Sequence, residues 1–157
     1  MSKLMVADET KFKSLKKEEK TAFITILCML SATDGNIRKE EIKYIEELAA
    51  QMETEVKQSY FNYPRELGVC KAALIKNRRL ALELLKNMFA LAYTDNVFTD
   101  SEGHFICEIS DALKIEPQKV SEISSWIIDR IIWLEQAALI FEETPASDGG
   151  SHDTGNC

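Results

Sequence analysis

The stretch "LSATDGNIRKEEIKYIEELAAQM", Leu30 to Met52, is followed 61 residues later by "LAYTDNVFTDSEGHFICEISDAL", Leu91 to Leu113. Aligned without a gap, the two stretches share six identical positions of 23. The polar matches carry the information, because any two amphipathic helices share apolar spacing. These matches are Thr33/Thr94, Asp34/Asp95, Glu41/Glu102 and Glu47/Glu108. We therefore predict an internal repeat in which each half is a helical hairpin, with the aspartate in its turn and the glutamate near the start of its second helix.

Helical spacing of apolar residues dominates the rest of the chain, and strand alternation is nearly absent. The fold class predicted is all-α: a single compact helical domain of about seven helices built from two duplicated helical hairpins. Helices are expected over about 17–33, over a segment ending near 52, over 77–93 and over 100–113, with one or two short helices in 54–76. A long last helix should start at Pro117, since proline suits a first helical turn. Trp126 and Trp133 share one face of it and are expected to be core or helix-packing anchors.

The domain predicted spans residues 17–143, after an N-terminal segment 1–16 and before a polar, glycine-rich tail 144–157 that we expect to be disordered. The net charge of −7 argues against a nucleic-acid binder. Basic clusters at 13–17 and 76–79 could touch an anionic surface, which leaves peripheral membrane association open.

No signal-peptide core is visible, and the longest mostly apolar stretch, 22–32, is about half of a membrane span. The four cysteines are scattered and are interpreted as reduced thiols. They are Cys28, Cys70, Cys107 and Cys157. A cytoplasmic location is therefore expected.

The stretch "DGNIRKEE" resembles the second half of an EF-hand loop, but the first half is missing. Counting back from Gly35, the first and third ligand positions are Leu30 and Ala32, and in the second copy they are Leu91 and Tyr93. None of these side chains coordinates calcium. Only the aspartate–glutamate pair of each copy remains.

Two interpretations of that pair stay open. In one, Asp34 and Asp95 form turns, since Gly35 and Asn96 tolerate left-handed geometry, and Glu102 belongs to a capping box that starts at Thr99. Arg38 stands where that threonine would be in the first copy, so the first cap should be weaker or differently placed. In the other, the carboxylates bind a hard cation such as calcium or magnesium, because an aspartate at a helix C-terminus otherwise costs about 0.3–1 kcal/mol. The candidate metal ligands are Asp34, Glu41, Asp95 and Glu102.

The stretches "LSATDGNIRKEEIKYIEELA" and "LAYTDNVFTDSEGHFICEISDALKIEPQKV" resemble the two halves of the TerB-like family, which is associated with bacterial tellurite resistance. That family carries A-x-A-D-G-x-[IF]-x-x-x-E in each half, and the resemblance covers about residues 17–141. It implies an all-helical fold of duplicated hairpins and a divalent metal bound by the same four carboxylates. Asn96 replaces the second glycine, and Thr33 and Thr94 replace alanine.

Enzymatic activity is not expected. The two histidines are His104, predicted to be exposed, and His152 in the tail, and neither belongs to a metal or nucleophile motif. The function expected is a non-enzymatic cytoplasmic stress-response module that binds a divalent cation and acts through protein partners. The alternative is a metal-free helical interaction domain whose aspartates serve only as turn residues.

Overall fold

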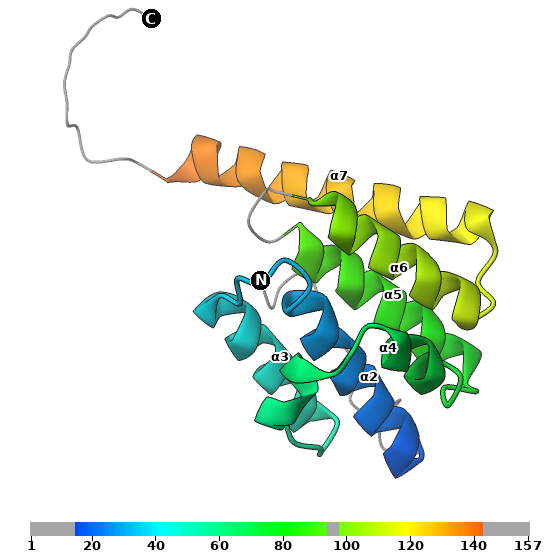
Figure 1. The fold of residues 1–157 in the computed structure, drawn as a ribbon. Helices are drawn as coiled ribbons and strands as arrows, with labels where there is room; N and C mark the ends of the chain where they lie inside the picture. The colour runs from blue at the N-terminus through cyan, green and yellow to red at the C-terminus, as the bar shows by residue number, and fades with distance from the viewer. Residues whose placement is uncertain (1–14, 94–97, 143–157) are drawn as a thin grey trace, which may run out of the picture.

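The computed structural model describes residues 15–93 and 98–142, and within these ranges the chain forms six α-helices, one 3-10 helix and no strand (Figure 1). The elements are α2 (Lys17–Ser31), α3 (Lys39–Gln51), η2 (Gln58–Asn62), α4 (Glu66–Ala72), α5 (Arg78–Ala92), α6 (Asp100–Ala112) and α7 (Pro117–Phe141). The all-α prediction is confirmed. The predicted disordered tail and residues 1–14 of the predicted N-terminal segment lie outside the described residues.

Helix α2 forms the centre of the core. All ten residues from Ala22 to Ser31 are buried, and α2 packs against α3, η2, α4, α5 and α6. A helix that is apolar on every side is stable in water only when neighbours cover all of its faces. The other helices, apart from α7, form that cover (Figure 1).

The helices of the two predicted hairpins have matching bounds. Helix α2 covers 17–31 and α5 covers 78–92, while α3 covers 39–51 and α6 covers 100–112, so each start and each end is shifted by 61 residues. The C-terminal ends of α3 and α6 also match. Glu53 follows α3 and Lys114 follows α6, and both have a positive φ, at 55° and 59°. Such angles are uncommon outside glycine. Each helix closes with the same Schellman-type hydrogen bond: Thr54 N–H to Ala49 O at 2.9 Å, and Ile115 N–H to Ser110 O at 3.0 Å.

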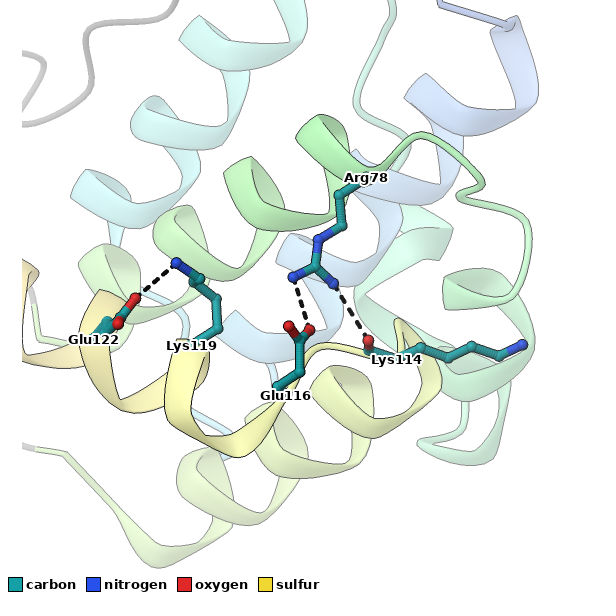
Figure 2. A network of polar contacts seen from close by, with 5 residues as sticks. All are labelled: Arg78, Lys114, Glu116, Lys119 and Glu122. Carbon is teal, nitrogen blue, oxygen red and sulfur yellow. Dashed lines mark hydrogen bonds and ion pairs between the residues drawn. The ribbon is translucent and has the colours of Figure 1, made fainter.

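Helix α7 is fixed to the domain at its N-terminal end. Arg78, the first residue of α5, donates to Glu116 Oε1 at 2.7 Å and to the Lys114 carbonyl at 3.3 Å (Figure 2). A hydrogen bond from its own backbone and the Arg78 guanidinium hold the pKa of Glu116 below its usual value. Lys119 pairs with Glu122 at 2.7 Å one turn later. These contacts place the starts of α5 and α7 next to each other.

Of the two roles predicted for Trp126 and Trp133, core residue or helix-packing anchor, the core role is wrong. Their side chains are 49% and 62% exposed, and Ile127 is the one residue of α7 that is fully buried. Apolar spacing along a helix shows that it has apolar faces, but it does not show what covers each face.

Candidate functional site

The turn of the first hairpin is built by Asp34. Its side chain is exposed, and Oδ1 accepts the backbone N–H of Asn36 at 3.0 Å. Gly35 follows with φ at 77°, as its place in the turn predicts. An aspartate that accepts from the backbone two residues on forms an Asx turn, so Asp34 has a local structural role.

Glu41 and Glu102 are buried at the starts of α3 and α6, each 6% exposed. Glu102 Oε1 accepts the Thr99 N–H at 3.0 Å, and Thr99 Oγ1 accepts the Glu102 N–H at 3.1 Å, which completes the predicted capping box. Glu41 Oε1 accepts the Arg38 N–H at the longer distance of 3.4 Å. An arginine side chain has no acceptor to return the bond. The first cap stands at the matching position and lacks a side-chain hydrogen bond of the kind that Thr99 makes.

Glu19 is a third carboxylate of the same kind, which the sequence analysis missed. It is 5% exposed, accepts the Lys16 N–H at 3.4 Å through Oε1, and accepts the Lys76 and Asn77 N–H groups through Oε2 at 3.0 and 3.1 Å. Its position three residues after Lys16, just before an apolar run, was the available signal. The long-range bonds to the start of α5 have no signal in the sequence.

Within residues 15–93 and 98–142, no three histidine, cysteine, aspartate or glutamate side chains come together as a metal site requires. The described candidates Asp34, Glu41 and Glu102 therefore do not form such a group by themselves. The fourth candidate, Asp95, lies outside the described residues.

One pocket nevertheless lies between the two motifs. It measures about 230 Å³ and is lined by Thr33, the neighbour of Asp34, and by Ser101, the neighbour of Glu102. Arg65 also lines it and forms an ion pair with Glu108 at 2.8 Å. The turn of the first hairpin and the second helix of the other hairpin therefore meet at one place in the fold.

The basic clusters noted in the sequence also meet. The bonds of Glu19 hold Lys16, at the start of α2, next to the backbone of Lys76, before α5. A pocket of about 570 Å³ lies beside them and is lined in part by Lys16, Lys17 and Lys71. The described part of the chain therefore has a basic end, although the whole chain is acidic.

A buried polar contact joins the two hairpins. Tyr44 on α3 donates to Asn87 Oδ1 on α5 at 2.7 Å, and the Asn87 amide donates to the Glu83 carbonyl at 2.6 Å. Burial, with the nearby charges of Glu83 and Glu47, raises the pKa of Tyr44. This phenol therefore stays protonated and serves as a hydrogen-bond donor inside the core.

Histidine 104 is exposed, as predicted, and Cys28 is buried, while Cys70 and Cys107 are free and exposed. No helix in the two described ranges combines the length and the apolar character needed to cross a membrane.

The chain matches no family model, no curated protein and no solved structure. The resemblance to the TerB-like family stays a prediction. What the fold and these contacts define is a class: an all-α domain in which capping carboxylates fix the starts of three helices.

Proposed function

We propose that this chain is a non-enzymatic cytoplasmic module that acts by binding protein partners along α7. One observation carries this proposal: six of the nine exposed large apolar side chains in the described residues lie on this helix. They are Trp126, Ile132, Trp133, Leu139, Ile140 and Phe141. A concentration of large exposed apolar side chains on one helix is typical of a protein interface.

The described motif residues Asp34, Glu41 and Glu102 have structural roles, as expected for an interaction domain in which they shape turns and helix starts. Asp34 forms its turn, and Glu41 and Glu102 cap their helices through backbone bonds. Each of the three described motif carboxylates therefore has a partner in the backbone. The matching helix bounds and helix ends support the further proposal that the domain is two copies of one hairpin.

The test uses a photo-crosslinking amino acid in place of Trp133, in the full chain inside cells. The matched control places the same group at Lys43, which is exposed on α3. We expect protein adducts from position 133 and few from position 43. Equal yields at both positions would contradict a binding role for α7.

A divalent cation at the motif turns is the second candidate function. It rests on the pocket between Thr33 and Ser101, the chain neighbours of Asp34 and Glu102; the lining of this pocket includes Arg65 and none of the four carboxylates. The ligands proposed are Asp34, Glu41, Asp95 and Glu102, with calcium or magnesium as the ion, since both prefer oxygen ligands. This second candidate includes the stress-response role that the resemblance to TerB-like proteins implies: a module that binds a divalent cation and acts through protein partners.

Calorimetric titration of calcium, magnesium, manganese and zinc tests the cation. Saturable binding should be present in the wild type and lost in Asp34→Asn/Asp95→Asn. Glu102→Gln is the sharper variant, because glutamine serves a capping box as well as glutamate but removes a charged ligand. We expect that variant to keep its stability and to bind the ion more weakly. Wild-type protein that takes up no ion would rule out the candidate.

A further inference from the structure

Helix α7 extends beyond the helix that supports it. The groove between α5 and α7 is lined by α5 from Arg79 to Lys86 and by α7 from Lys119 to Trp126. The two helices therefore start at the same end and run side by side. Helix α5 has 15 residues and α7 has 25, so α7 passes the end of α5 by about 15 Å at 1.5 Å per residue. At the register of the groove, the end of α5 falls near Ile132.

The apolar surface on α7 is large. Leu139, Ile140 and Phe141 in the overhanging part are 84%, 72% and 80% exposed. With the two tryptophans and Ile132, this amounts to roughly 700 Å², at about 150–250 Å² for a whole aromatic side chain and less for an aliphatic one. A stable protein–protein interface buries about 800 Å² on each partner, whereas the largest apolar patch of a monomer is about 300–600 Å². The exposed apolar side chains of α7, summed over all sides of the helix, thus total close to the area of one side of a dimer interface.

The arrangement of the side chains fits a twofold axis. Trp126, Trp133 and Ile140 are seven residues apart and form one stripe, with Trp133 at its centre. In an antiparallel pair of α7 helices centred on Trp133, Trp126 of each copy lies level with Ile140 of the other. A twofold interface requires a surface that is complementary to itself in this way.

The charges on α7 favour the antiparallel direction. Glu122 and Asp129 flank the first half of the stripe and are exposed, and Gln136 takes the corresponding position in the second half. In a parallel pair, Asp129 would lie against its own copy. In the antiparallel pair it lies level with Ala137, so the like charges stay apart.

The same charges argue against a lipid surface. Three acidic residues of α7 are exposed, Glu122, Asp129 and Glu135, whereas its two basic residues, Lys119 and Arg130, are partly buried and Lys119 is paired with Glu122. Helices that lie on membranes are rich in lysine and arginine on their polar face, because cytoplasmic lipid surfaces are negative.

From these observations we propose that α7 is a homodimerisation helix, which pairs with α7 of a second copy in antiparallel orientation about Trp133. This inference rests on the proposed function, in which α7 binds a protein partner, and it identifies that partner as a second copy of the chain. The two identical helices cover each other's stripe, and the overhanging ends reach across the neighbouring copy.

Sedimentation equilibrium of the purified full chain tests the proposal. We expect a mass of twice 17.8 kDa. Ile140→Glu should raise the dimer dissociation constant about thirtyfold or more, because it places a charge against Trp126 of the other copy at both ends of the stripe. The control Val69→Glu places the same charge at an exposed apolar site on α4 and should leave the constant unchanged. A monomer at all concentrations, or equal effects of the two variants, would overturn the proposal.

Cysteine pairs test the orientation, in a chain in which Cys70, Cys107 and Cys157 are serine. Asp129→Cys combined with Ala137→Cys should form intermolecular disulfides, whereas Asp129→Cys alone should not. Efficient linkage by the single variant would indicate parallel helices and contradict the model. The photo-crosslinker at Trp133 separates the two proposals: adducts with other proteins only would refute the second copy and keep the interaction function, and no adducts would refute both.

Discussion

Removal of the Glu19 carboxylate should destabilise the domain more than any other single change among its capping residues. Glu19 is 5% exposed and accepts two backbone N–H groups, those of Lys76 and Asn77, at 3.0 and 3.1 Å. A hydrogen bond to a charged group contributes about 1.5–3 kcal/mol. Water can reach part of the freed backbone, because Lys76 and Asn77 are exposed. We therefore expect Glu19→Ala to cost about 2–4 kcal/mol of unfolding free energy.

Urea unfolding followed by circular dichroism measures this cost. The midpoint should fall while the slope stays constant, since the surface exposed on unfolding does not change. Glu18→Ala is the matched control, because Glu18 lies in the same helical turn but is exposed, and it should cost about 0.5 kcal/mol. Glu19→Gln keeps one acceptor oxygen, so its urea midpoint should lie between those of Glu18→Ala and Glu19→Ala. Equal midpoints for Glu18→Ala and Glu19→Ala would refute the assignment of Glu19 as the link between α2 and α5.

Two substitutions and one labelling experiment test other parts of the core. Tyr44→Phe removes the donor to Asn87 Oδ1 and should cost about 1–3 kcal/mol in the same urea experiment, because it leaves a buried acceptor unpaired; an unchanged midpoint would contradict this. Gly68→Ala should destabilise by about 1–3 kcal/mol despite the better helix propensity of alanine, since its Cβ would lie 2.8 Å from the Phe105 ring; a stabilised variant would show that the ring can move. Burial raises the pKa of the Cys28 thiol to about 12, so a thiol reagent at pH 8 should modify it only as fast as the domain opens, and rapid labelling of Cys28 in native protein would argue against its burial.

The sequence predicted those parts of the fold that depend on local chemistry. The helix expected over 17–33 is observed over 17–31, and the helix expected over 77–93 is observed over 78–92. These predictions succeed because apolar spacing and caps act within a few residues. The Thr99–Glu102 box was predictable for the same reason. The contacts of Glu19 with the start of α5 were not, because they join segments 57 and 58 residues apart.

The exposure of α7 was likewise not predictable. Trp126 and Trp133 have the spacing of core residues, but whether a helix is covered depends on the length of its neighbour. Here α5 ends near the level of Ile132, which leaves the last turns of α7 uncovered, and Trp126 lies beside α5 at the edge of the groove, where it stays half exposed. For the motif carboxylates, the structure gives a backbone role to Asp34, Glu41 and Glu102, which spacing alone did not distinguish from a ligand role.

The most direct test of the account is the fluorescence of Trp126 and Trp133, which are the two tryptophans of the chain and both lie on α7. If α7 pairs with a second copy, the native emission should be blue-shifted and protected from acrylamide. It should shift to the red on dilution below the dissociation constant, and in Ile140→Glu this shift should occur at a concentration about thirtyfold higher. Emission that is red, open to the quencher and identical in wild type and Ile140→Glu would contradict the account.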